Sequence, residues 1–120
     1  MINTLAKNDA NLPLTPAVFN ILLALADGEK HGYAIMQEVE ASTHGEVKMG
    51  PGTLYGSIKR MLEAGMIVES DERLDAQMDD QRRRYYRLTG TGQRCLKTEA
   101  ERMARQVAIA QMKQVLECSG

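Results

Sequence analysis

The sequence predicts a mainly α (α+β) domain in which three short helices and a two-stranded ribbon precede one long helix. Three observations lead to this fold class. Apolar residues recur at spacings of three and four in three stretches, each bounded by proline or glycine. Residues 84–88 alternate as a strand does, and residues 96–110 carry a longer apolar seam. A chain of 120 residues with 43% hydrophobic content is expected to form one domain with a modest core.

The chain is expected to begin with a loose segment and a first helix. Residues 1–13 are polar and without periodicity, so they predict a flexible arm. Thr15 and Pro16 then offer an N-cap and a proline for the first helical turn. Val18, Ile21 and Leu22 continue the apolar face, and the helix is predicted to end near residues 27–28.

A second helix is expected from about residue 31 to residue 42, with Ile35, Met36 and Val39 on one face. His31 at its start is interpreted as a structural residue rather than a ligand or a switch. Residues 47–48 are predicted to form a very short strand. A third helix starts at Pro51, where the missing N–H of proline costs no hydrogen bond.

The third helix is predicted to have one apolar and one cationic face. Leu54, Ile58, Met61 and Leu62 share one side with Gly65 at about 100° per residue, and Gly65 is a natural left-handed C-cap. The opposite side carries Gly56, Thr53, Lys59, Arg60 and Glu63. Proline and glycine therefore delimit a short, rigid helix with a core face and a cationic outer face.

Two strands and a long helix complete the predicted fold. One strand starts at residues 66–68, and residues 84–88 alternate with Tyr86 on one side and Tyr85 on the other. Tyr86, like Tyr33 of the second helix, is expected in the core. The last helix is predicted from about residue 91 to residue 118. Its seam consists of Leu96, Ala100, Met103, Val107 and Ala110.

The net charge of −1 hides an uneven distribution. Residues 81–98 hold six cations and no acid, residues 47–60 hold Lys48, Lys59 and Arg60, and residues 61–80 hold seven acids. Such basic segments suit a polyanionic partner. Asp79 and Asp80 either pair with the arginines that follow them or keep the tip of the ribbon away from DNA, and the second interpretation is preferred.

This order of elements predicts a winged helix-turn-helix that binds double-stranded DNA, because a helix fits the major groove and a basic ribbon can follow the adjacent backbone. In the alternative interpretation, Lys59 and Arg60 belong to an ordinary solvated face. A related alternative is a winged helix that serves only as a protein–protein interaction module, without specific DNA binding.

Three blocks of sequence resemble the signature of the PadR family of bacterial transcriptional regulators: HGYAIMQEVE (31–40), GPGTLYGSIKRMLEAGMI (50–67) and RRRYYRLTGTGQRCL (82–96). The single final helix resembles the short subgroup of that family. Gly50, where a serine cap is common, and Gly56, where proline is common, depart from the pattern and loosen the start of the third helix. The resemblance implies DNA contacts by Thr53, Tyr55, Ser57, Lys59, Arg60, Arg82, Arg83 and Arg84. Tyr55 is expected to pack its ring on the domain with its hydroxyl on a phosphate, or to be purely structural.

The resemblance also implies a homodimeric repressor that binds a pseudo-palindromic operator and leaves it when a small aromatic or phenolic effector binds. The expected organisation is an arm (1–13), a winged helix-turn-helix (14–90) and a C-terminal dimerisation helix (91–120). The same apolar stripe could instead pack on its own domain. The predicted dimer interface is Leu96, Ala100, Met103, Val107 and Ala110. An effector pocket, or equally a dry dimer core, is predicted from Val18, Phe19, Leu22, Met103 and Val107.

The sequence lacks the residues that other classes of function require. No nucleophile with a base, paired carboxylates or cofactor loop is recognisable, so no enzyme and no cofactor are expected. The two histidines and two cysteines have no metal-ligand spacing, so no metal is expected. No apolar run approaches the roughly 20 residues that span a bilayer, and MINTLAKNDANL lacks the apolar stretch of a signal peptide. A cytoplasmic protein without membrane contact is the expectation.

Overall fold

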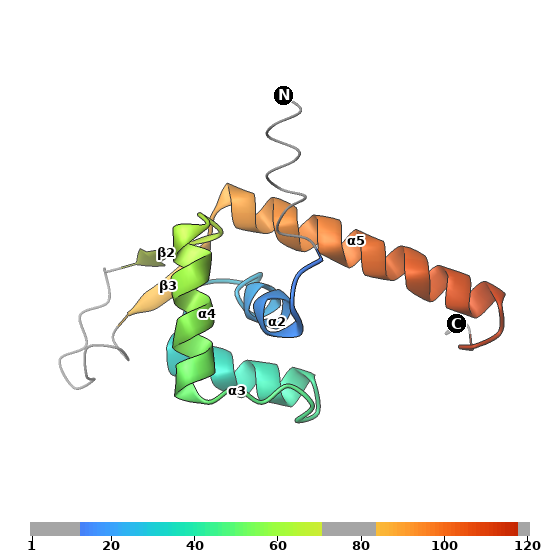
Figure 1. Cartoon of the computed structure of the whole chain (residues 1–120), viewed down its shortest axis with the longest axis horizontal. Coiled ribbons are helices and arrows are strands. Elements are labelled where there is room, and N and C mark those ends of the chain that lie inside the picture. Colours follow the sequence, from blue (N-terminus) through green and yellow to red (C-terminus); the bar gives the residue numbers. More distant parts are fainter. Residues whose placement is uncertain (1–12, 71–83, 118–120) are drawn as a thin grey trace.

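The computed structural model describes residues 13–70 and 84–117. Four helices and a small sheet make up this part of the chain (Figure 1). In chain order the elements are α2 (Pro16–Ala24), β1 (Lys30–His31), α3 (Gly32–Ser42), α4 (Pro51–Glu63), β2 (Ile67–Ser70), β3 (Tyr85–Leu88) and α5 (Gly90–Met112). The mainly helical winged helix-turn-helix with a long final helix is thereby confirmed. The predicted arm and the acidic tip of the ribbon lie outside the described residues.

Helix α2 starts as its sequence predicts and ends earlier. The Thr15 hydroxyl accepts a hydrogen bond from the Val18 N–H at 3.1 Å, and Pro16 follows at the first turn. The helix ends at Ala24 rather than near residues 27–28. The Lys30 ammonium donates to the Ala24 carbonyl at 2.7 Å, so a tertiary contact satisfies the C-terminal end of the helix.

Helix α3 begins beside the sheet, and His31 is its N-cap. The His31 Nδ1 atom accepts a hydrogen bond from the Ala34 N–H at 3.2 Å, which confirms the structural role expected of this residue. The strand predicted at residues 47–48 is wrong, because the third strand is Lys30–His31. Two residues carry no alternation signal, and only pairing with β3 makes them a strand.

The three-stranded antiparallel sheet has the order β1-β3-β2, so β3 is the central strand. Its register pairs Ile67 with Leu88 and Ser70 with Tyr85. Tyr86 is buried as expected, and burial raises its pKa to about 12, which keeps the phenol protonated. Tyr33 was expected in the core, and this is wrong, because 51% of its surface is exposed.

The core lies where α2, α3 and α4 meet the sheet (Figure 1). Ile21, Ile35, Leu54 and Ile67 are almost completely buried there. Helix α4 ends as predicted: Gly65 has a φ of 77°, a left-handed conformation that glycine adopts without steric cost. The chain can therefore turn directly from α4 into β2.

Helix α5 packs on the domain with its first half only. Thr89 caps it through a hydrogen bond from the Gly92 N–H at 3.0 Å, and Cys95, Leu96 and Glu99 are buried. The helix ends at Met112, six residues before the predicted end at 118. Gln114 has a left-handed φ of 64° there, and the Val115 N–H donates to the Ala110 carbonyl.

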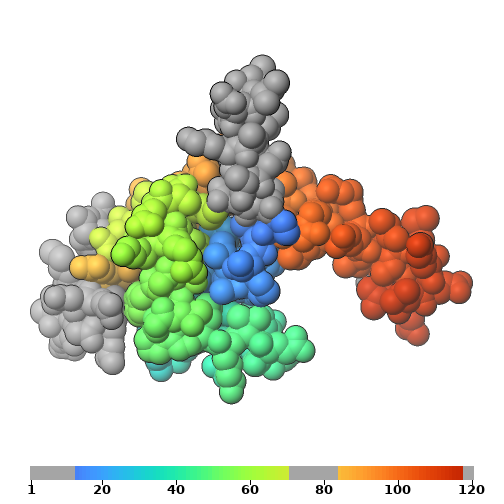
Figure 2. Space-filling model, in the orientation of Figure 1, coloured from blue at the N-terminus to red at the C-terminus, as the bar shows by residue number. Residues whose placement is uncertain are grey.

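The C-terminal half of α5 stands away from the rest of the molecule (Figure 2). No helix in the described part of the chain has the length and apolar character needed to cross a membrane.

Candidate nucleic-acid interface

Helix α4 presents two chemically different faces. Leu54, Ile58 and Met61 are buried, and Thr53, Lys59 and Arg60 are exposed. The burial of these three residues follows the pattern that the sequence predicts at about 100° per residue, whereas Leu62, predicted on the same side, is 36% exposed. Two cations and a hydroxyl on the outer face of a short helix are chemically suited to phosphates and base edges.

Ser57 was included among the DNA contacts, and its position corrects that prediction. Only 1% of its surface is exposed. It stands one residue before Ile58 and three after Leu54, so it shares their buried side. Its hydroxyl accepts a hydrogen bond from the Arg60 guanidinium at 3.3 Å. Ser57 therefore lies on the buried side of α4, where its hydroxyl contacts Arg60, and not on the exposed face.

Tyr55 lies on the border between the two faces. Its ring is half-buried and packs against the core, as expected. The hydroxyl lies against Gly32, at the start of α3. A contact between this hydroxyl and a phosphate stays a prediction.

The N-terminal end of α4 is open. Gly50 caps the helix without a side-chain hydrogen bond, and residues 50–53 are all exposed. The first N–H groups of a helix attract anions when no side chain satisfies them.

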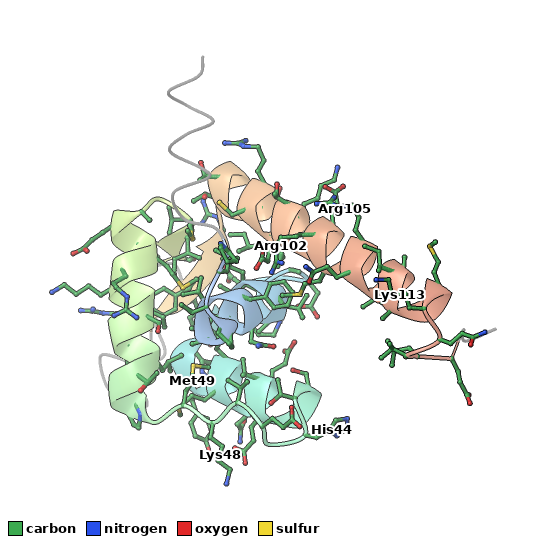
Figure 3. The ribbon with its side chains drawn as sticks, turned by 45° about the vertical axis from the view of Figure 1, so that its right-hand side comes forward. His44, Lys48, Met49, Arg102, Arg105 and Lys113 are labelled. Carbon is green, nitrogen blue, oxygen red and sulfur yellow. The ribbon has the colours of Figure 1, made fainter. Side chains whose placement is uncertain are left out.

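Lys48 is exposed in the loop before this end, whereas Met49 packs on the core (Figure 3). The predicted site omitted Lys48. Its signal was available in the acid-free segment 47–60.

Of the three arginines that are predicted to contact DNA from the wing, Arg84 lies within the described residues. Arg84 is exposed, with its Nε atom 3.4 Å from a carboxylate oxygen of Glu69. An exposed ion pair of this kind contributes little to stability, so Arg84 can exchange Glu69 for another anion. Arg82 and Arg83, together with Asp79 and Asp80, lie outside the described residues.

The predicted dimer seam on α5 is partly exposed to solvent. Ala100 and Val107 are exposed, the latter by 45%, and Met103 and Ala110 are partly exposed. Leu96 is a correction: it is only 9% exposed and belongs to the core of its own domain. Helical spacing could not reveal that α5 packs internally up to Glu99. Further exposed apolar residues follow: Ile109, Met112, Val115 and Leu116.

The residues of the predicted effector pocket are not equally available. Leu22 has no exposed surface, so the prediction that it lines an open pocket is wrong. Val18 and Phe19 are partly buried. A shallow hollow of about 190 Å³ lies instead between residues 13–18 and the end of α4, and of the predicted set it includes Val18.

Sequence reasoning missed a buried carboxylate that joins α5 to the domain. Glu99 has no exposed surface, and its Oε2 atom accepts a hydrogen bond from the Leu14 N–H at 3.1 Å. Arg102 donates to both carboxylate oxygens, at 2.9 and 3.0 Å. The hydrogen bonds from Arg102 lower the pKa of Glu99 despite its burial. The available signal was its place between Cys95 and Met103 on the inner face of α5.

Within residues 13–70 and 84–117, no group of three acidic, histidine or cysteine side chains lies close enough together to hold a metal ion.

Comparison with known proteins gives a consistent result. Residues 21–98 match the transcriptional regulator PadR-like family. The chain is 38% identical over 89 residues to transcriptional regulator Rv3488 of Mycobacterium tuberculosis, covering 74% of this chain and 76% of that protein. It is 43% identical over 86 residues, 71% of its length, to an uncharacterised 37.1 kDa protein in transposon TN4556 of Streptomyces fradiae, and spans only 22% of that larger protein.

Among solved structures, a PadR family transcription regulator from Clostridium difficile R20291 superposes with a TM-score of 0.66 at 22% identity, over 83% of this chain and 99% of that one. This likeness supports the fold. The family match carries the assignment, because it covers more than half of the chain: the protein belongs to the PadR-like family of transcriptional regulators, which act through DNA and not as enzymes.

Proposed function

We propose that this chain is a sequence-specific, dimeric transcriptional repressor that binds a pseudo-palindromic operator and is released from it by a small molecule. The observation that supports DNA reading best is the outer face of α4. Thr53, Lys59 and Arg60 are exposed there, opposite a fully packed inner face. In this proposal α4 enters the major groove.

Phosphate contacts flank the reading helix in this proposal. Lys48 and the open N–H groups at the start of α4 approach one strand of the duplex. Arg82, Arg83 and Arg84 of the wing approach the neighbouring backbone. The Tyr55 hydroxyl is a further predicted phosphate contact. Phosphates position the protein without carrying sequence information.

A dimer presents two copies of α4 to the DNA. Ala100, Met103, Val107 and Ala110 form one stripe of α5, in which Ala100 and Val107 are exposed and Met103 and Ala110 are partly exposed among the described residues. A second copy of α5 along this stripe would bury it about a twofold axis. The two α4 helices would then meet half-sites of a pseudo-palindrome.

The effector is proposed to bind between the subunits. Val18 and Phe19 of α2 and Met103 and Val107 of α5 supply flexible, apolar surface. Methionine adapts its shape to flat aromatic molecules, which suits a phenolic or other aromatic ligand. Ligand binding would change the distance between the two α4 helices of the dimer. We propose that this regulator acts in the cytoplasm.

The experiment that tests DNA reading replaces the two exposed cations of α4. Lys59→Ala/Arg60→Ala is expected to fold normally and to bind an operator selected from genomic fragments well over tenfold more weakly, because each lost contact costs about 1–3 kcal/mol. The affinity is measured by fluorescence anisotropy at fixed salt.

A matched control removes the same amount of charge far from α4. Arg105 on α5 and Lys113 directly after its end are both exposed (Figure 3), and Arg105→Ala/Lys113→Ala should keep the affinity of the parent protein. Equal losses in the two double variants would mean that only net charge matters. An unchanged affinity of a folded Lys59→Ala/Arg60→Ala protein would refute the proposed reading face.

A further inference from the structure

The start of α3 is a point where three elements of the DNA-binding domain meet. His31 caps α3, and its ring lies edge-on to the ring of Tyr85 in β3, with centroids 5.4 Å apart and an interplanar angle of 84°. The backbone of the same residue pairs with β3. The start of α3 is therefore attached to the central strand of the wing.

The same point also touches α4. A Cβ atom built on Gly32 would overlap the Tyr55 hydroxyl oxygen and lie 2.9 Å from the ring carbon that carries it. A side chain at position 32 therefore requires the Tyr55 ring or α4 itself to move. The absence of a side chain therefore lets the ring of α4 rest directly on the backbone of α3.

We propose that Gly32 and Tyr55 are positioning residues for sequence recognition: their contact sets the separation between α4 and the wing. This inference rests on the proposed function, since it concerns how α4 reads DNA. Lys59 stands one turn after Tyr55 on the same helix, so a displacement at Tyr55 is transmitted to the reading face. The wing stays in place through His31 and Tyr85.

A small displacement of α4 affects its hydrogen bonds to base edges more than its contacts with phosphates. Hydrogen bonds to base edges require side chains to be held within about half an ångström, whereas phosphate contacts tolerate small shifts. A change at this junction should therefore reduce discrimination between sequences and leave nonspecific binding intact.

An added methyl group at Gly32 cannot be absorbed by the hydroxyl alone. A second ring carbon of Tyr55 would lie 3.0 Å from the new Cβ, and the ring itself is packed on the core. Rotating a packed ring off its rotamer is unfavourable. Movement of α4 away from α3 is the expected response.

The test compares two glycines in equivalent positions. Gly32 and Gly90 are the first residues of α3 and α5, and a Cβ on Gly90 would meet only the end of the Arg94 side chain, at 3.4 Å. The probes are a duplex enriched by the parent protein from a random-sequence library and a shuffled version of that duplex. Gly32→Ala should bind the enriched duplex at least about tenfold more weakly and the shuffled duplex equally well. Gly90→Ala should match the parent on both.

Two further variants keep the inference testable even if Gly32→Ala does not fold. Tyr55→Phe keeps the ring and should keep the ratio of the affinities for the enriched and shuffled duplexes within about twofold, because loss of the proposed hydroxyl–phosphate contact would weaken both duplexes equally. Gly32→Ala/Tyr55→Leu removes the obstructing ring and should recover most of the discrimination.

The outcomes separate this inference from the proposed function. If the parent protein enriches no duplex, sequence-specific binding itself is refuted, and the inference falls with it. If the parent does enrich one, the inference alone is overturned by unchanged discrimination in folded Gly32→Ala, by no recovery of discrimination in the double variant, or by lost discrimination in Tyr55→Phe.

Discussion

At the residue scale, the most consequential side chain outside the DNA-binding face is Glu99. It is a carboxylate with no exposed surface, and it holds both the Leu14 backbone and Arg102. A buried charge is stable only when such partners surround it. This residue therefore joins the start of α2 to α5, and through them the DNA-binding domain to the proposed dimer helix.

The first prediction concerns the pH dependence of this junction. The pKa of Glu99 in the folded protein lies below its ordinary value of 4.5. Its contribution to stability is therefore complete above about pH 4.5 and is lost as the pH falls through the folded-state pKa. Glu99→Gln keeps the size of the side chain and removes the charge. It should lower the free energy of unfolding at neutral pH by about 1–3 kcal/mol and flatten the acid dependence.

Urea unfolding at several pH values and one protein concentration measures this effect. Glu101→Gln is the control, because Glu101 is exposed on the same helix. A Glu99→Gln protein with the stability and acid profile of Glu101→Gln would show that the charge of Glu99 contributes nothing.

At the element scale, α4 combines a well-packed inner face with an uncapped start. Gly50 has a φ of −73° and a ψ of 171°, which serine also adopts, and nothing lies within 4 Å of a Cβ built there. The unused cap leaves N–H groups of the first turn free to meet an anion. A capping side chain at position 50 would therefore stabilise α4 and at the same time occupy an N–H group that is otherwise free for an anion.

The second prediction follows from this geometry. Gly50→Ser should raise the free energy of unfolding by a few tenths of a kcal/mol, because serine caps helices better than glycine. Gly50→Ala should lower it or leave it unchanged, since alanine is a poor cap. Urea denaturation of both variants measures the difference. A stabilisation by alanine equal to that by serine would mean that chain stiffening, and not capping, is responsible.

The wing gives a third prediction. Replacing Arg82, Arg83 and Arg84 by alanine should weaken binding to all duplexes about equally and lower the salt slope by up to about 0.9 per lost phosphate contact. Titrations at a series of salt concentrations measure that slope. Arg87→Ala is the control, because Arg87 is exposed on the opposite side of β3 from Tyr86. An altered sequence preference at constant slope would instead assign base reading to the wing.

At the scale of the whole molecule, the open feature is the second half of α5. Val107, Ile109 and Met112 are exposed by 45%, 51% and 81% on a helix that leaves its own domain (Figure 2). Exposed apolar surface of this kind is typical of an interaction site. A second copy of the chain is the partner that the proposed function requires.

The fourth prediction tests this partner. Val107→Glu places a charge on the proposed seam and leaves the packed contacts of Leu96 and Glu99 intact. Sedimentation should show monomers, and affinity for an operator with two half-sites should fall at least about tenfold, while binding to one half-site is retained. Ala108→Glu, one residue further and off the seam, is the control. A Val107→Glu dimer as stable as the parent dimer would place the interface elsewhere.

The sequence by itself determined the helices, the wing and the outward cations of α4. Local signals are sufficient for these features, because N-caps, glycine turns and apolar spacing act within a few residues. Thr15 and Gly65 have the roles that their neighbours in the sequence predict. Lys59 and Arg60 are exposed because Leu54, Ile58 and Met61 occupy the opposite side of the same helix.

Only the tertiary structure decided the contacts between residues far apart in the chain. Lys30 and His31 became a strand by pairing with β3, Leu96 was buried in the core of its own domain, and Glu99 accepts a hydrogen bond from the Leu14 N–H. No local pattern contains this information, since the free energy of these contacts comes from packing and from hydrogen bonds between elements. Gly32 is the clearest case: its sequence position marks the start of a helix, and the ring of Tyr55 against it gives the physical reason for a glycine there.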